Sequence, residues 1–481
     1  ILYMRLIASF LLLFSVLSKA KEDKPNILFI YLDDFGWRDT SYAGSDFYET
    51  PNIDSLAKGG MVFSNAYAGA ANCAPSRACL LSGQYSPRHK IYNVGTGPRG
   101  KSAYRRLIHI PGTNTLSPEI PTWAKAAKDA GYATASIGKW HLSSDPTRHG
   151  FDLNIGGSKS GSPPKGYFPP HGKIKGLTKV GRNEYLTDTL TSEAIKFINE
   201  KSELPWLLYL THFAVHTPIQ AKNKDKEYFE NKAPGKLHKD TTMAAMIKSV
   251  DDGVGKIIST LNSLGIKEKT VIIFYSDNGG YGPATSMHPL KGYKGTYYEG
   301  GIRVPFFVNW PKVIRSGSKC ETPITAVDLY PTICEITGGQ INKDHSLDGI
   351  SLIPLLKGKE IKERSLYWHF PAYLQSYQRH NEQPDPLFRA RPCGVIRKGK
   401  WKLIEYFEDG RTELFNLNND ISESKNLTTD QPEIASSLLS CLRKWRSQVK
   451  APVPTQPNPK FDQKAEQKAI NELLKRNPDN S

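Results

Sequence analysis

The chain has 481 residues and a formal net charge of +17, from 64 basic and 47 acidic residues. Because single hydrophobic cores stop growing at roughly 250–300 residues, this length predicts one large domain and one smaller one. The excess of basic residues favours a polyanionic partner, although it could also serve only to keep the protein soluble. The absence of a Cys-x-x-Cys pair argues against a zinc site.

Residues 1–20 have the pattern of a signal peptide. Arg5 precedes an apolar run at residues 6–16, and Ser18-Lys19-Ala20 resembles a cleavage site. The run is too short for the roughly 20 residues that span a bilayer, so we expect no membrane insertion. We therefore expect an exported protein, periplasmic or extracellular. The compact length and the small number of cysteines favour a bacterial origin. Export makes sulfated polysaccharide a better polyanionic partner than nucleic acid.

Short apolar runs alternate with helical patterns over the first 310 residues. The runs predict buried strands and the patterns between them predict helices. Strands are expected at residues 26–32, 132–137, 206–210, 270–275 and 304–310, and helices at 118–130, 190–201 and 243–264. This alternation predicts an α/β fold whose central sheet is mostly parallel and flanked by helices, with ligands at the carboxyl ends of the strands.

The pattern changes after residue 360. Strands at 395–404 and 412–417, joined by a turn at 408–411, and a helix at 432–449 predict a small α+β subdomain with an antiparallel sheet. The expected division is a signal peptide at 1–20, a catalytic domain at 21–360, a subdomain at 361–450 and a tail at 451–481, with a surface helix at 464–476.

Three stretches with little regular pattern, residues 84–118, 156–176 and 371–392, are expected to be loops. Long loops in compact enzymes are often functional, and basic and aromatic side chains suit sulfated sugars. The alternative is an ordinary solvated surface. The basic and aromatic residues of the first and third loops are Arg88, His89, Lys90, Arg99, Lys101, Arg105, Arg106 and His109, and Tyr373, Tyr377, Arg379, His380, Phe388, Arg389 and Arg391.

Acidic and amide side chains follow two of the predicted strands. Asp33 and Asp34 come directly after the first, and Asp277 and Asn278 come after the strand at 270–275. Adjacent carboxylates repel each other and favour a bound cation, and oxygen ligands favour Ca²⁺ or Mg²⁺ over zinc. Either pair alone would also suit a turn. Together, at two strand ends, they predict a divalent-cation site.

Residues 73–83 read Cys-Ala-Pro-Ser-Arg-Ala-Cys-Leu-Leu-Ser-Gly. Pro75 suits the first turn of a helix, which predicts a helix at 76–82. Cys73 would then lie just before a helix N-terminus, where free N–H groups and the dipole favour negative charge. The alternative is that Cys73 is only a small buried hydrophobic residue.

Three further motifs carry basic side chains. Residues 138–142, Gly-Lys-Trp-His-Leu, offer Lys139 and His141. Residues 214–218 place His216 two positions before a proline, with His212 as the competing histidine. Taken singly, each of these two motifs has a simpler explanation: the lysine is exposed on the surface and the histidines are packed in the core.

The third of these motifs, at residues 292–305, contains Gly-x-Lys and then Glu-Gly-Gly-x-Arg-x-Pro. Lys294 fits the Gly-x-Lys spacing and Lys291 falls outside it. Glu299 and Arg303 are expected to form a salt bridge that braces the turn.

In this order the motifs resemble the type I, formylglycine-dependent sulfatases, arylsulfatase A-like members of the alkaline phosphatase superfamily. The resemblance spans residues 26–305 and continues weakly through 347–354 and 414–417, and Ser143 stands where the family usually has glycine. It implies an alkaline phosphatase-like fold, conversion of Cys73 to formylglycine by a formylglycine-generating enzyme, and hydrolysis of a sulfate ester. If Cys73 is converted, five cysteines remain, so at least one is expected to be free.

The resemblance also implies roles for individual residues. The cation, usually Ca²⁺ with Mg²⁺ as the alternative, would be bound by Asp33, Asp34, Asp277, Asn278 and the modified Cys73. The catalytic set would be Cys73, Arg77, Lys139, His141, His216 and Lys294, of which Lys139, His216 and Lys294 bind the substrate. Arg77 would hold the hydrated aldehyde, His216 with Lys294 would protonate the leaving alcohol, and His141 would deprotonate the second hydroxyl of the diol so that sulfate leaves.

Two other functions stay open at this point. A phosphodiester or phosphonate monoester hydrolase of the same superfamily would share the motifs. A chain whose Cys73 is not converted would be a non-catalytic protein that binds sulfated glycans. The basic loops favour a sulfated carbohydrate as the partner of either a sulfatase or a binding protein.

Overall fold

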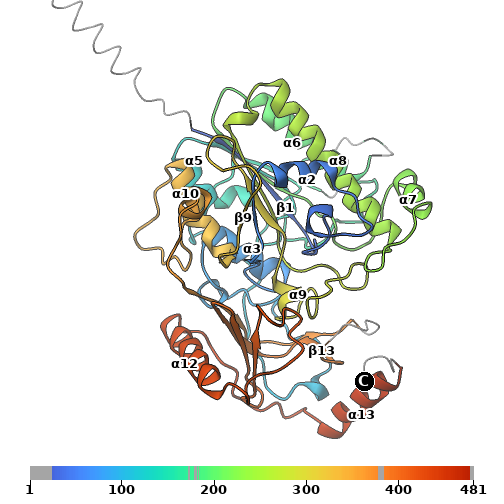
Figure 1. Cartoon of the computed structure of the whole chain (residues 1–481), viewed down its shortest axis with the longest axis vertical. Coiled ribbons are helices and arrows are strands. Elements are labelled where there is room, and N and C mark those ends of the chain that lie inside the picture. The colour runs from blue at the N-terminus through green and yellow to red at the C-terminus, as the bar shows by residue number, and fades with distance from the viewer. Residues whose placement is uncertain (1–23, 172–173, 178–180, 182–183, 378–383, 477–481) are drawn as a thin grey trace, which may run out of the picture.

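The computed structural model describes residues 24–171, 174–177, 181, 184–377 and 384–476 (Figure 1). The predicted signal peptide, and Arg379 and His380 of the third loop, lie outside these residues. An eight-stranded sheet has the order β5-β4-β6-β1-β7-β8-β2-β9. Its strands are β1 (Asn26–Leu32), β2 (Met61–Phe63), β4 (Ala133–Gly138), β5 (Leu153–Ile155), β6 (Trp206–Thr211), β7 (Thr270–Ser276), β8 (Phe306–Asn309) and β9 (Ser318–Cys320).

The first five strands of that order are parallel, and β8 pairs antiparallel with β7. The predicted mostly parallel sheet is confirmed. Side chains alternate between its faces: Phe29 and Tyr31 of β1 belong to one core, and Leu28 and Ile30 to the other. Because both faces are buried, the strand is apolar throughout.

Helices cover both faces of the sheet (Figure 1). One layer consists of α3 (Cys73–Ser82), α5 (Trp123–Asp129) and α10 (Leu329–Thr337), and the other of α2 (Pro51–Lys58), α6 (Leu186–Glu200), α7 (Asn223–Glu230) and α8 (Thr241–Ser263). The helix predicted from residue 118 begins only at Trp123, because the Thr122 side chain caps it by accepting a hydrogen bond from Lys125 N at 3.2 Å. Short helices are α4 (Ser86–His89), α9 (Glu299–Ile302) and α11 (Ile353–Leu356).

A second, antiparallel sheet lies in the C-terminal part of the chain and has the order β11-β14-β15-β16. Its strands are β11 (Ser365–Phe370), β14 (Cys393–Lys398), β15 (Trp401–Tyr406) and β16 (Thr412–Asn416). The single strand predicted at 395–404 is wrong: the chain reverses between β14 and β15 at Gly399, whose φ of +53° is in the left-handed region that suits glycine.

The remaining C-terminal elements surround this sheet. The helix α12 (Pro432–Gln448) packs on β14 and β15, and α13 (Gln463–Arg476) packs on the turn at residues 102–104. The predicted domain boundaries at 360 and 450 stay predictions. Two-stranded pairs are β3 (Ala66–Tyr67) with β10 (Ile324–Thr325), and β12 (Leu374–Gln375) with β13 (Phe388–Ala390).

Two further observations concern the described residues as a whole. No helix among them has both the length and the apolar composition that a bilayer crossing requires. All six cysteines lie among them, and all six are free thiols.

Candidate active site

The predicted site residues meet at the carboxyl edge of the parallel sheet. Asp33 and Asp34 follow β1, Lys139 follows β4, and Asp277 follows β7, which are parallel strands of this sheet. Ligand atoms of Asp33, Asp34, Cys73 and Asp277 all lie within 4.8 Å of one another, and all four residues are buried. The topology therefore assembles residues from four distant parts of the sequence in one place.

Cys73 is the first residue of α3, and Asn72 is the N-cap. The helix therefore starts earlier than the predicted 76–82, and Cys73 lies within its first turn. Burial alone would raise the pKa of the Cys73 thiol, but the positive charges of Lys139 and Lys294 outweigh it and bring that pKa to about 6. Position 73 thus favours a negatively charged group.

The oxygen atoms of the acidic cluster fit a divalent cation. Among the described residues, Asp33 Oδ1 and Asn278 Oδ1 are buried and have no hydrogen-bond partner. Burial and the neighbouring Asp33 raise the pKa of Asp277 to about 7, although Arg77 opposes this. A hard cation among these oxygens would satisfy both free acceptors and stabilise the three carboxylates in their charged forms.

Two buried lysines pair with the aspartates that follow β1. Lys139 Nζ donates to Asp33 Oδ2 at 2.5 Å, and Lys294 Nζ donates to Asp34 Oδ2 at 2.7 Å. Burial would lower the pKa of Lys294, but Asp34 outweighs it and raises that pKa well above its usual value. Lys294 therefore brings a full positive charge to the cluster. Lys291 points elsewhere, with Nζ 4.4 Å from the ring centre of Tyr298.

His216, and not His212, reaches the cluster. Its Nε2 lies 3.8 Å from Asp34 Oδ2, and its loop is tied to β1 because Val215 N donates to Asp33 O at 2.7 Å. Burial and Lys294 lower the pKa of His216, but Asp33 and Asp34 outweigh them, so that it is raised. His212 is buried, and it is not among the described residues whose ligand atoms gather at the acidic cluster.

The pKa of His141 is shifted in the opposite direction to that of His216. Burial and the charge of Lys139 lower the pKa of His141 well below its usual value, so it is neutral. Its φ is +64°, and Gly161 lies so close that a Cβ there would come within 2.4 Å of the ring. Gly138 is equally constrained, because a Cβ would come within 1.9 Å of Thr211 O. Such strained backbone is typical of functional sites.

Arg77 is fully buried beneath the cluster. Its Nε and Nη2 contact Asp277 Oδ2 at 2.9 Å, and its Nη1 donates to Thr211 Oγ1 at 2.6 Å and to Lys139 O at 3.0 Å. The ring of Tyr31 lies beside it, 5.0 Å from the guanidinium carbon. These contacts orient Asp277 and Lys139. The predicted role of holding a hydrated aldehyde stays a prediction.

Sequence reasoning missed two groups that support these residues. Thr211, the last residue of β6, connects Arg77 to Lys139, and a polar residue ending an apolar strand was its signal. The second group braces α9 behind Lys294: Lys402 Nζ lies 3.0 Å from Glu299 Oε1 and 2.8 Å from Glu423 Oε1. The predicted Glu299–Arg303 pair is present at 3.4 Å.

Comparisons with known proteins show the family of the chain. The family model described as sulfatase matches residues 25–339, and that described as N-sulphoglucosamine sulphohydrolase, C-terminal, matches residues 293–448. A sulfatase of Formosa agariphila is 31% identical over 93% of each chain. The N-acetylgalactosamine-6-sulfatase of Mus musculus is 30% identical over 74% of this chain and 70% of its own length.

Solved structures show the same architecture. Ps i-CgsB in complex with k-i-k-neocarrahexaose has a TM-score of 0.72 at 29% identity, covering 95% of this chain and 99% of that one. The phosphonate monoester hydrolase of Agrobacterium radiobacter shares the fold, with a TM-score of 0.62 at 21% identity over 90% of this chain and all of its own. Sulfatases generally use a formylglycine and a divalent metal. The chain belongs to the sulfatase family and hydrolyses sulfate esters.

Proposed function

We propose that the chain hydrolyses a sulfate ester of a sulfated carbohydrate, with a formylglycine derived from Cys73 and with Ca²⁺, or else Mg²⁺, as the cation. The observation that carries this proposal is the meeting of Asp33, Asp34, Cys73 and Asp277 within 4.8 Å, next to two buried lysines. Relatives named for N-acetylgalactosamine 6-sulfate and a neighbour bound to a neocarrahexaose support a carbohydrate substrate.

Two groups would complete this site. A hydrated formylglycine at position 73 supplies a nucleophilic hydroxyl and a second hydroxyl through which the sulfate can be expelled. A divalent cation bound by Asp33, Asp34, Asp277 and Asn278 supplies positive charge that lowers the pKa of a hydroxyl and stabilises sulfuryl oxygens. Formation of the aldehyde would require a formylglycine-generating enzyme during maturation.

The chain's own residues bind and orient the sulfate group. Lys139 and Lys294 place two ammonium groups beside the carboxylates, where they would stabilise the negative charge that grows on the sulfuryl oxygens. Arg77 fixes the carboxylate of Asp277 with contacts at 2.9 Å, so this side chain would need no reorganisation during the reaction. Burial of these groups strengthens every such interaction.

The two histidines suit opposite proton transfers. His216, whose pKa is raised, can hold a proton and give it to the leaving alcohol, together with Lys294. His141, whose pKa is lowered, is neutral and can accept a proton from a hydroxyl at position 73. Pairs of titratable groups whose environments separate their pKa values are the usual mark of such a division of roles.

A two-part experiment tests this proposal. The chain is produced together with a formylglycine-generating enzyme, and the peptide that contains Cys73 is weighed, because formylglycine is lighter than cysteine. The protein is then assayed for sulfate release from defined sulfated sugars, and for phosphate or phosphonate release from matched esters. Conversion with sulfate release is expected. An unconverted Cys73, or faster hydrolysis of the phosphonate esters, would overturn the proposal.

Export is proposed on the pattern of residues 1–20 alone. A chain fused at residue 20 to a reporter that folds only outside the cytoplasm tests it. Reporter activity is expected with residues 1–20 present and should disappear when they are deleted.

A further inference from the structure

Arg389, on β13, is a buried arginine without a carboxylate partner. It is 7% exposed, its Nε donates to Gln375 O at 2.9 Å, and its Nη1 donates to Lys294 O at 3.3 Å. Among the described residues, no acceptor contacts its Nη2 and no acidic side chain lies within ion-pair distance. Arg389 therefore brings an uncompensated positive charge directly behind the backbone of Lys294.

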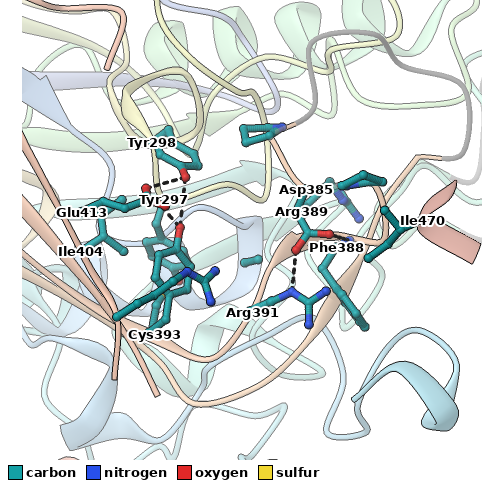
Figure 2. A pocket seen from close by; sticks show the side chains of 15 residues that line it. Tyr297, Tyr298, Asp385, Phe388, Arg389, Arg391, Cys393, Ile404, Glu413 and Ile470 are labelled. Carbon is teal, nitrogen blue, oxygen red and sulfur yellow. Dashed lines mark hydrogen bonds and ion pairs between the residues drawn. The ribbon is translucent and has the colours of Figure 1, made fainter. Parts of the chain in front are cut away.

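Arg391, two residues further along and just past the end of β13, differs from Arg389 because it is paired with carboxylates, as is usual for a buried arginine with a structural role. It pairs with Asp385 at 2.5 Å, with Glu466 at 3.0 Å and with Glu408 at 3.1 Å. Both arginines line a pocket of about 200 Å³, and Figure 2 shows a dashed line from Arg391 to Asp385. Buried charges are normally paired, so the isolated charge of Arg389 indicates a ligand.

Stacked rings hold the Arg389 guanidinium in place. Its central carbon lies 3.8 Å from the ring centre of Tyr377. The ring of Tyr377 stacks on Tyr293 with centres 5.8 Å apart, and Tyr281 meets it edge-on at 5.2 Å. A guanidinium held by one ring and two backbone carbonyls loses little conformational entropy when it binds an anion.

A second arginine faces the same place from another loop. Arg99 N donates to Tyr373 O at 3.3 Å, and Arg99 Nη2 donates to Val94 O at 2.9 Å. No acidic side chain among the described residues pairs with Arg99 either. Gly100, the next residue, lies against the strands that carry Arg389, because a Cβ there would come within 2.8 Å of Phe388 and 3.5 Å of Gln375. The charges of Arg389, Tyr377 and Cys73 all act on Arg99.

We propose that Arg99 and Arg389 form a second anion subsite beside the catalytic centre. It would bind a further anionic group of the substrate, a second sulfate or a carboxylate, while the reacting sulfate lies at Cys73. This inference rests on the proposed function, because it takes the cluster around Cys73 as the catalytic centre. It makes the enzyme selective for polyanionic over singly charged esters, because guanidinium groups match the geometry of both sulfate and carboxylate.

The test compares three aryl esters that differ in a second anionic group: phenyl sulfate, 3-carboxyphenyl sulfate and 1,3-phenylene disulfate. The matured enzyme and its Arg99→Gln and Arg389→Gln variants are assayed for kcat/KM with each. We expect each variant to lose about tenfold on at least one doubly charged ester, the effect of one charge-assisted hydrogen bond. Activity on phenyl sulfate should change less than twofold. The ester that is affected distinguishes a sulfate ligand from a carboxylate ligand.

Two controls keep the test decisive. Arg106→Gln removes an arginine of the same loop that already pairs with Glu466 at 3.3 Å, and should leave all three values unchanged. Arg389→Lys keeps the charge and should lie between wild type and Arg389→Gln. An equal loss on all three esters, or no loss on either doubly charged ester, would overturn the subsite. A wild type that releases sulfate neither from these three esters nor from the defined sulfated sugars would instead contradict the proposed function.

Discussion

Lys294 Nζ lies 2.7 Å from Asp34 Oδ2, and the same carboxylate oxygen lies 3.8 Å from His216 Nε2. A proposed cation ligand, a proposed sulfate-binding lysine and a proposed general acid thus share one buried carboxylate. Burial would raise the pKa of Asp34, but Lys294 and His216 outweigh it and lower that pKa. Asp34 therefore stays ionised. Its carboxylate links the proposed cation site and the sulfate-binding Lys294 to the proposed general acid His216.

Replacing Lys294 should disable the reaction without unfolding the protein. Lys294→Ala removes an ammonium group aimed at developing charge, which typically costs about 100- to 1,000-fold in rate. Steady-state kcat with an aryl sulfate measures it. Lys291→Ala is the matched control, because this nearby lysine contacts Tyr298 and Glu423 O instead. Equal losses in the two variants would contradict the assignment of Lys294.

Replacing His216 should produce a loss that depends on the leaving group. A general acid contributes about 100- to 10,000-fold when the leaving alkoxide is basic. His216→Ala should therefore lose most with alkyl or sugar sulfates and little with 4-nitrophenyl sulfate, whose leaving group needs no proton. The measurement is log kcat against leaving-group pKa, which should become steeper in the variant. If the plots of the variant and the wild type have the same slope, His216 does not protonate the leaving group.

Calcium should stabilise the protein through Asn278. A ligand at about 100 times its Kd adds about 2.7 kcal/mol to the free energy of unfolding. After EDTA treatment and desalting, Ca²⁺ should therefore raise Tm, and Asn278→Ala should shift the Ca²⁺ midpoint to higher concentration. Asp252→Asn, which removes only a surface partner of Lys248, is the control. An unchanged midpoint in Asn278→Ala would exclude Asn278 as a ligand.

The sheet and the core of the site could be predicted because each depends on local sequence. Buried parallel strands such as β1 must be apolar throughout, and polar residues directly after them fall at one edge of the sheet. The motifs around Asp33, Lys139, His216 and Lys294 therefore carried most of the information about where those side chains lie.

The rest depends on contacts that no local pattern encodes. Lys402 occupies an ordinary strand position of β15, and Glu423 lies in a loop, yet tertiary packing buries both against Glu299. His141 has a left-handed backbone, and Gly161 approaches its ring closely from another loop. The reversal at Gly399 was missed because the residues on both sides of it favour strands.

The buried group of Glu299, Lys402 and Glu423 predicts how stability depends on pH. Burial raises the pKa of Glu423 from 4.5 to about 7, although Lys402 opposes this. Between these pH values the folded state binds more protons than the unfolded state, so the free energy of unfolding falls as pH rises, by at most about 1.4 kcal/mol per pH unit. Burial would raise the pKa of Glu299, but Lys402 and Arg303 outweigh it and lower that pKa to about 2, so Glu299 titrates below this range.

Glu423→Gln removes this titration, so the Tm of the variant relative to wild type should increase steadily from pH 5 to pH 7. Thermal unfolding at several pH values in that interval measures the difference. The exposed Glu433→Gln on α12 should show a constant difference over the same interval. If the Glu423→Gln difference is also constant, Glu423 is ionised throughout and the charge of Lys402, balanced by two carboxylates, is what fixes α9 behind Lys294.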